Sequence, residues 1–296
     1  MIELFKGHIR LSIEEPYEGY CGTRFDWTGK IIQLWWKNIP ICTSEFGDRK
    51  DAMQGLGFFN EFGIDKAIGY DKCRVGNCFP KIGVGMLQKE SNDPYDFFHQ
   101  YKCVPFEFVT KNIESGVSIT TTNLLQPHSF VLEKKIHVTS NGFTIDYELK
   151  NLGETDIVTT EYVHNFLSPG QRKLSDSLKL TLGATINKDQ FESGINPNSC
   201  VSMSNNQFSW SHVPKSDFFF ENIAETLTDS GSWMLTDRQL HLSITERVNF
   251  KPHKINLWGR AHVVSPELFK NINLKPGETE RWQRVFEIQE IESAID

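Results

Sequence analysis

The stretch that decides the fold is Phe143-Thr-Ile-Asp-Tyr-Glu-Leu-Lys150, the turn Asn151-Leu-Gly-Glu154 and the run Thr159-Thr-Glu-Tyr-Val-His-Asn-Phe-Leu167. The first run alternates apolar and polar side chains, which indicates a strand with one buried face. Asn and Gly in the turn favour a sharp change of direction. We therefore predict two consecutive strands joined by a short connection.

The second run carries a histidine in its middle. Side chains of a strand point alternately to its two faces, so Tyr162, His164 and Phe166 share one face, whereas Asn165 points to the other. A titratable imidazole between two aromatic rings suits a site that handles a sugar by acid/base chemistry. An ordinary core histidine has the same neighbours, and from the pattern alone that interpretation is the more frequent one.

Strand patterns continue along the rest of the chain. Ser140-Asn141-Gly142 predicts a tight hairpin, and a short helix is expected only at Ser265–Lys270, where Pro266 would open its first turn. Regular strands separated by turns predict an all-β fold, a large twisted β-sandwich formed by residues 1–296 as one domain. Cys42–Cys78 is rich in Gly and Phe and predicts long loops over one mouth of the sandwich. The further expected strands are Ile9–Ile13, Gly29–Trp36, Val117–Thr122, Phe130–Thr139, Leu178–Leu182, Gly231–Thr236, Gln239–Glu246, Lys254–Trp258 and Glu280–Ile288.

Composition limits the kind of partner. The chain of 296 residues is 39% hydrophobic and 23% charged, enough to build a sizeable core. A net charge of -7 argues against nucleic acid, which requires a basic surface. There is no run of 18 apolar residues and no signal-like N-terminal segment, so we expect a cytoplasmic protein without a membrane span. The six cysteines are then expected to be free thiols, and Cys73 and Cys78 lack the second pair of ligands that a zinc site needs.

Three further segments carry polar groups that suit a binding site. Phe79–Gly85 places Lys81 just before two glycines, although a surface turn explains it as well. Phe97–Lys102 interleaves His99 and Lys102 with aromatic rings, as a sugar-stacking wall or an exposed strand edge would. Trp258–Glu267 ends in a carboxylate, which alternatively serves only to favour a helix N-terminus.

The order of these segments resembles the aldose 1-epimerase (galactose mutarotase-like) superfamily. The resemblance is carried by the strand pair Lys134–Asn151, by His164-Asn165-Phe166, and by the late acid followed by Leu274-Lys-Pro-Gly-Glu278. It covers most of residues 75–288, and the separation of His164 from Glu267 is similar to that in the hexose-6-phosphate mutarotases. The segment Phe97–Lys102 departs from that branch's motif.

The resemblance implies a sugar-converting enzyme that needs no cofactor and no metal. It implies that His164 is the general acid and Glu267 the general base of an epimerase that interconverts the α and β anomers of a monosaccharide by opening its ring. The two groups would then face one another across a cleft that holds one pyranose, with Lys81 at its rim. The residues that would contact the sugar are Lys81, His99, Lys102, Asn165, Asp217 and Trp258.

Two other functions stay open. A non-catalytic carbohydrate-binding protein would keep the aromatic wall and would need no placed base. A lyase or hydrolase acting on oligosaccharides would need two carboxylates that flank the scissile bond, and no convincing pair stands out. The sequence does not indicate the oligomeric state.

Overall fold

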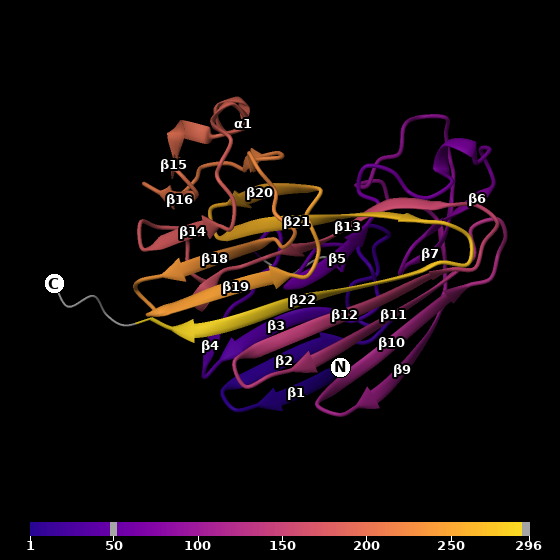
Figure 1. Cartoon of the computed structure of the whole chain (residues 1–296), viewed down its shortest axis with the longest axis horizontal. Helices are drawn as coiled ribbons and strands as arrows, with labels where there is room; N and C mark the ends of the chain where they lie inside the picture. Colours follow the sequence, from indigo (N-terminus) through magenta and orange to yellow (C-terminus); the bar gives the residue numbers. More distant parts are fainter. Residues whose placement is uncertain (48–51, 292–296) are drawn as a thin grey trace.

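Two large antiparallel sheets pack face to face in the computed structural model, which describes residues 1–47 and 52–291 (Figure 1). The nine-stranded sheet has the order β1 (Ile2–Lys6), β2 (Ile9–Glu14), β3 (Lys30–Trp36), β5 (Phe58–Phe62), β13 (Ile157–Asn165), β21 (Val263–Leu274), β20 (Lys254–Arg260) and β17 (Phe218–Phe220), with β4 (Ile39–Pro40) paired to β3. The ten-stranded sheet has the order β15 (Val201–Ser204), β16 (Gln207–Trp210), β14 (Leu178–Leu182), β18 (Ser232–Asp237), β19 (Leu242–Val248), β22 (Thr279–Glu290), β12 (Gly142–Asn151), β11 (Phe130–Val138), β10 (Gly116–Asn123) and β9 (Glu107–Ile113).

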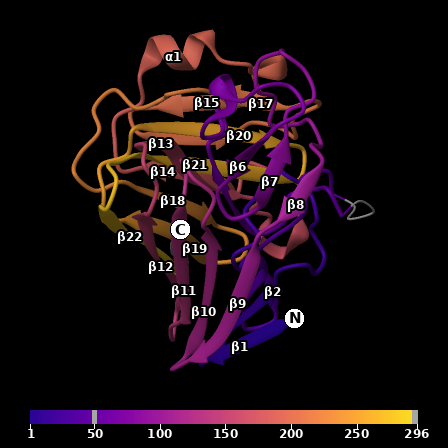
Figure 2. The same ribbon diagram turned by 90° about the vertical axis from the view of Figure 1, so that its right-hand side faces the viewer.

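A third, small sheet lies at one end of the sandwich, opposite the end formed by β14, β15 and β16 (Figures 1 and 2). Helical structure is limited to short pieces. The small sheet contains β6 (Cys78–Lys81), β7 (Gly85–Gln88) and β8 (Cys103–Pro105), and the helical pieces are α1 (Lys188–Ser193) and the 3-10 turns Tyr70–Lys72, Pro169–Gln171 and Pro197–Ser199. No helix of the described residues is long and apolar enough to cross a membrane.

Aromatic side chains from both large sheets fill the space between them. The ring of Phe58 on β5 lies 5.1 Å from Phe143 on β12 and 4.9 Å from Phe286 on β22. Such edge-on contacts between buried rings are favourable beyond the burial of their area. Gly57, immediately before β5, has a positive φ of 65°, and a Cβ there would lie 2.1 Å from the carbonyl oxygen of Ile31, so only glycine fits.

A buried charge network also crosses between the sheets. Arg284 on β22 donates to Glu161 on β13 at 2.7 Å and to Glu246 on β19 at 2.5 Å, and all three residues are fully buried. Removing one partner from such a network leaves a buried charge without compensation. The network therefore fixes the position of β13, whose opposite face carries His164.

The other face of the nine-stranded sheet is covered by loops and by the small sheet. Glu161 points into the sandwich, so the alternation of β13 sends Tyr162 and His164 to this covered face. A second apolar cluster forms there; it contains Tyr20, Phe25, Trp27, Phe59, Ala67, Tyr70, Phe79, Val84, Leu87, Tyr101, Phe166 and Val263.

The structure confirms the all-β sandwich and the strands expected from alternation, and it corrects two local predictions. Ser265–Lys270 is not a helix but the centre of β21. Cys42–Cys78 is not only loop, because it contains the central strand β5; residues 48–51 of this stretch lie outside the described part of the chain. Phe58–Phe62 does not alternate, since all five of its residues are buried, three apolar and two held by polar networks.

Candidate active site

His164 and Glu267 lie side by side on adjacent strands. The ladder between β13 and β21 pairs Glu161 with Lys270, and in the same register a bridge joins Leu167 to Val264, so His164 stands opposite Glu267. The imidazole Nε2 lies 3.4 Å from Glu267 Oε1. The predicted acid and base therefore meet through the register of two neighbouring strands.

Ser265 contacts both His164 and Glu267. Its hydroxyl oxygen lies 2.9 Å from His164 Nδ1 and 3.2 Å from Glu267 Oε1. It also accepts the backbone N–H of Asn165 at 3.0 Å. Ser265 and Glu267 are two residues apart on one strand, which places them on the same face.

Pro266 explains why this serine enters the ladder. Proline has no N–H to donate across to β13, so a regular pair of backbone hydrogen bonds cannot form there. Instead the Asn165 side chain donates to the carbonyl oxygen of Pro266 at 2.6 Å, and the Asn165 backbone N–H turns to Ser265. The interruption lies beside the acid/base pair.

Burial moves the two ionisable groups toward their neutral forms. Each residue is only 4% exposed. Burial, assisted by the nearby Arg24 guanidinium, lowers the pKa of His164 well below its ordinary value of 6.5. Burial raises the pKa of Glu267 to about 8, against the opposing effects of Arg24 and of the Ser265 hydrogen bond. Near neutral pH these two shifts leave the Glu267 carboxyl group protonated and the His164 imidazole uncharged.

Aromatic rings enclose the imidazole. Phe166 stacks on His164 with ring centres 4.0 Å apart and planes 8° apart. Trp258 on β20 meets the same ring edge-on at 5.1 Å and is only half-buried. Trp258 is thus the predicted sugar-stacking residue that lies against the pair and still reaches the surface.

A second buried charge network adjoins the pair. The Arg24 side chain donates to Glu61 at 2.9 Å, to Glu45 at 3.2 Å and to the Tyr162 hydroxyl at 3.2 Å. Tyr162 in turn donates to Glu61 at 2.7 Å. Phe97 covers the guanidinium, with its ring centre 4.7 Å away. The positive charge of Arg24 is therefore neutralised within the protein and is held close to His164.

Lys81 belongs to this network and is not on a rim. Its ammonium lies 3.5 Å from Glu61, donates to the Tyr95 hydroxyl at 2.9 Å, and is 1% exposed. Burial lowers the pKa of Lys81 to about 8, although Glu61 opposes this. The expected placement at the mouth of a cleft is wrong, because the side chain points into the protein.

The remaining predicted contact residues lie apart from the pair. His99 and Lys102 are exposed and both bind Glu90, at 2.9 and 3.2 Å. Asn165 points between the sheets toward Glu246, on the face opposite His164. Asp217 forms an ion pair at 3.1 Å with Arg260, which lies on β20 two residues after Trp258.

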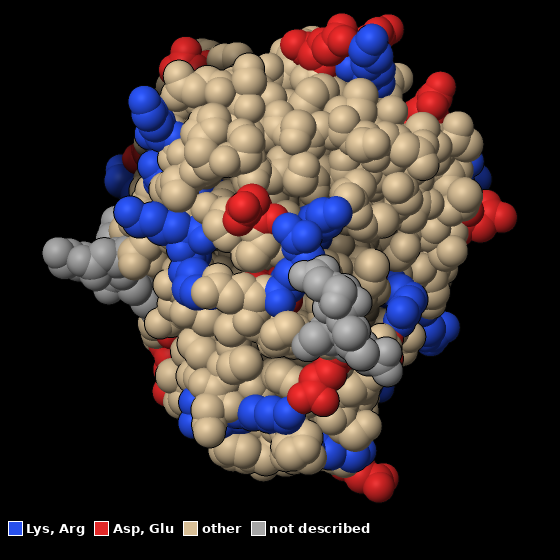
Figure 3. Space-filling view, turned by 90° about the vertical axis from the view of Figure 1, so that its left-hand side faces the viewer, with Lys and Arg blue, Asp and Glu red and all other residues tan. Residues whose placement is uncertain are grey.

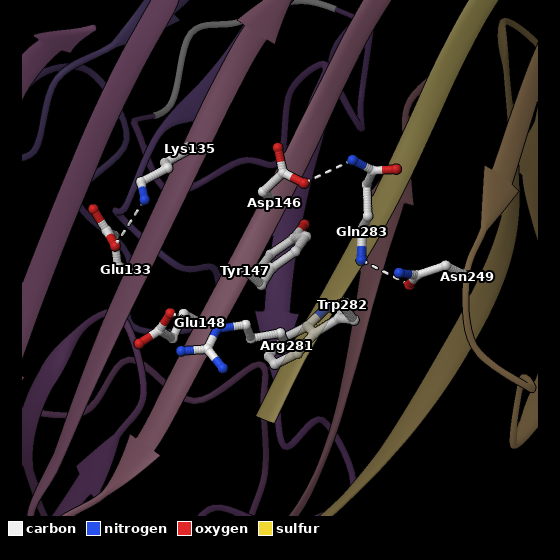
Figure 4. Close-up of a pocket in the computed structure, with 9 residues that line it drawn as sticks. All are labelled: Glu133, Lys135, Asp146, Tyr147, Glu148, Asn249, Arg281, Trp282 and Gln283. Carbon is white, nitrogen blue, oxygen red and sulfur yellow. Dashed lines mark hydrogen bonds and ion pairs between the residues drawn. The ribbon is translucent and has the colours of Figure 1, made fainter. Parts of the chain in front are cut away.

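The pair does not face an open groove. His164 and Glu267 touch, so no pyranose fits between them, and a substrate must approach both from one side. Four hollows in the described part of the chain lie elsewhere. One of 370 Å³ lies on β11, β12 and β22 of the ten-stranded sheet, where its charged side chains pair with one another (Figure 4). Another hollow, of 850 Å³, is lined by residues of the segment 66–80, together with Pro127, His128, Thr155, Asp156 and Val158.

Basic and acidic side chains are interspersed over the face of the molecule shown in Figure 3. Within residues 1–47 and 52–291, no three His, Cys, Asp or Glu side chains are grouped so as to hold a metal ion. The six cysteines are free thiols.

The fold is that of the galactose mutarotase-like proteins. A candidate aldose 1-epimerase from Escherichia coli K12 superposes with a TM-score of 0.60 at 12% identity, covering 98% of each chain. Galactose mutarotase-like proteins from Clostridium acetobutylicum and Lactobacillus casei superpose at 0.59 and 0.56, with 12% and 13% identity, covering 98% of this chain and 95% and 100% of theirs. The sequence itself matches no family model and no curated protein.

Two residues of the site were not predicted from the sequence. Ser265 stands two positions before Glu267, and the alternation of a strand would have placed both on one face. Arg24 follows Gly22-Thr23 without a pattern that marks it. Its role depends on contacts with three distant segments.

Proposed function

We propose that this protein is a mutarotase of the aldose 1-epimerase type, in which His164 and Glu267 open and close the ring of a monosaccharide. The observation that carries the proposal is the contact between Nε2 and Oε1 at 3.4 Å on one face of a galactose mutarotase-like sheet. Trp258 beside His164 supplies an aromatic surface for the C–H groups of the sugar.

Contact between the two groups suits this reaction better than a wide separation does. The ring oxygen and the anomeric hydroxyl oxygen are bonded to the same carbon. An acid and a base that lie next to one another can therefore reach both oxygens from one side of the substrate. Neighbouring strands with side chains on one face provide that arrangement.

The protons balance in both halves of the reaction. One member of the pair removes the anomeric hydroxyl proton while the other protonates the ring oxygen, and the bond between that oxygen and the anomeric carbon breaks. The carbonyl group then rotates about the bond to C2. The pair, whose roles are now exchanged, returns one proton and removes the other, so the opposite anomer forms and the enzyme is restored. Each positioned proton transfer contributes about 10² to 10⁴ in rate.

The cations near the pair favour a neutral sugar. Arg24 and Lys81 both bind Glu61, and Arg260 binds Asp217. None of these three cations is left without a carboxylate partner, as recognition of a phosphate group would require. Hexose 6-phosphates still belong in the substrate panel, because the spacing of His164 and Glu267 is similar to that of their mutarotases.

The test is the rate at which anomers of a sugar panel equilibrate, followed by polarimetry and by exchange NMR. The wild-type protein is expected to accelerate equilibration of at least one sugar over buffer. His164→Gln and Glu267→Gln are each expected to lower that rate about 10²-fold or more. His137→Gln, on the outer face of β11, is the matched control and should keep full activity. An inactive wild type across the panel, or an active His164→Gln, would refute the proposal.

A second candidate is a carbohydrate-binding protein without activity. It is favoured by the burial of the pair, since His164 and Glu267 are each 4% exposed. A sugar that binds in calorimetry and whose anomers do not exchange faster than in buffer would establish it.

A further inference from the structure

We infer that Ser265 is a positioning residue that holds His164 with its proton on Nδ1, so that Nε2 is the ring atom that exchanges protons. The inference deepens the proposed function, since it assigns a task at the same site to a residue outside the acid/base pair. Ser265 is completely buried and touches both members of the pair.

The assignment follows from the capacity of one hydroxyl group. A serine hydroxyl has one hydrogen to donate and two lone pairs to accept with. The backbone N–H of Asn165 occupies one lone pair, because an amide nitrogen is only a donor. One hydrogen and one lone pair remain for two partners, His164 Nδ1 and Glu267 Oε1.

Only one placement of the Ser265 hydroxyl hydrogen suits both the neutral and the ionised carboxyl group of Glu267. If the hydroxyl hydrogen points to Glu267 Oε1, the remaining lone pair accepts a hydrogen from Nδ1, whether or not Glu267 is ionised. If the hydrogen points to Nδ1 instead, the hydroxyl lone pair faces an ionised Oε1 and the contact is repulsive. The hydroxyl therefore keeps Nδ1 protonated throughout the proton exchange between Nε2 and Oε1.

The consequence is chemical as well as structural. Nε2 is the imidazole atom that faces Glu267. With Nδ1 fixed as a donor, the neutral ring presents a lone pair at Nε2, and the charged ring presents a proton there. A ring with the opposite tautomer would place its lone pair against Ser265, away from Glu267 and the substrate.

The experiment is side-chain nitrogen NMR of the histidines, with His164→Gln used to assign the signals of His164 among the nine histidines. The wild type is expected to show Nδ1 protonated and Nε2 unprotonated in the neutral ring. Ser265→Ala is expected to shift the ring to the Nε2-protonated form and to lower kcat about 10²-fold, with KM changed far less. Ser265→Thr, which keeps a hydroxyl, should restore the wild-type signal and most of the rate.

Ser243→Ala is the control for general effects. It removes a similarly buried hydroxyl group from the ten-stranded sheet, since Ser243 is 4% exposed in the native protein. A wild-type ring protonated on Nε2, or an unchanged tautomer in Ser265→Ala, would overturn the inference. If Ser265→Ala does not fold, the tautomer of His164 in the wild type and in Ser265→Cys tests the inference instead. If no sugar is turned over, the proposed function fails while the tautomer measurement still decides this inference.

Discussion

Replacing Glu267 with glutamine is expected to stabilise the protein, and increasingly so as the pH rises. The carboxyl group is 4% exposed, and burial raises its pKa from the ordinary value of 4.5 to about 8. Between these two pH values the folded protein keeps a proton that the unfolded chain has released. The folded state binds more protons than the unfolded state, so stability falls as the pH rises through this window.

The size of the effect follows from the same two values. One pKa unit corresponds to about 1.36 kcal/mol, so the burial of this carboxyl group costs roughly 3 to 5 kcal/mol at pH 8. Only a small part of that cost is present near pH 5, which lies just above the ordinary pKa of 4.5. Glutamine is neutral at every pH and still offers an oxygen to the Ser265 hydroxyl. His164 acts in the opposite direction, because its lowered pKa makes stability rise with pH up to about 6.5.

Urea unfolding at pH 5, 6.5 and 8 measures the difference between the wild type and Glu267→Gln. The advantage of the variant should grow by roughly 2 to 4 kcal/mol from pH 5 to pH 8. Glu225→Gln, which changes an exposed carboxyl group, should show no such trend. A difference between wild type and Glu267→Gln that is independent of pH would show that the carboxyl group is not held neutral in the folded protein.

The remaining predictions concern pH, the core network and the aromatic wall. The kcat/KM of mutarotation should fall above about pH 8, where Glu267 gives up the proton that the pair shares; an alkaline limb absent up to pH 10 would contradict this. Arg284→Ala should lower the unfolding free energy in urea by roughly 3 to 5 kcal/mol, since it leaves Glu161 and Glu246 buried without their cation. Trp258→Ala should raise KM more than it lowers kcat, and equal losses in steady-state kinetics would show that the ring does more than stack on the sugar.

The strands were predictable where one face is buried and the other is wet. In Phe130–Val138 and Gly142–Asn151 buried and less buried residues alternate, so the pattern of the sequence reports the structure directly. Phe58–Phe62 is buried on both faces, and its Asn60 and Glu61 look like surface residues. These two polar side chains are held by contacts with distant segments of the chain, which no local pattern contains.

The helix predicted at Ser265–Lys270 was wrong for a related reason. Serine followed by proline and glutamate is a common start of a helix. In the folded chain Pro266 is tolerated within a strand because the Asn165 side chain satisfies its carbonyl oxygen. The residue that favours a strand here is Asn165, which lies 101 residues away on the paired strand β13.

His164 and Glu267 could be singled out from the sequence, and their contact could not. His164 was found from its aromatic neighbours, and Glu267 from a resemblance in order. Their contact depends on the register between β13 and β21. A register shift of one residue would turn the side chains of one strand to the opposite face of the sheet. Lys81 was misplaced because a lysine just before two glycines gives no sign that its charge is neutralised by a buried glutamate.

His164 and Glu267 are held rigidly because β5 and β13 each place two neighbouring residues in different buried networks. Asn60 and Glu61 on β5 point to opposite faces, as do Glu161 and Tyr162 on β13. One member of each couple joins the network between the sheets, and the other joins the network around Arg24. The strand that carries His164 is therefore clamped from both sides. Under the proposed function, a choice between sugars would then depend on the covering loops, where Phe97 lies against Arg24, while the distance between His164 and Glu267 stays fixed.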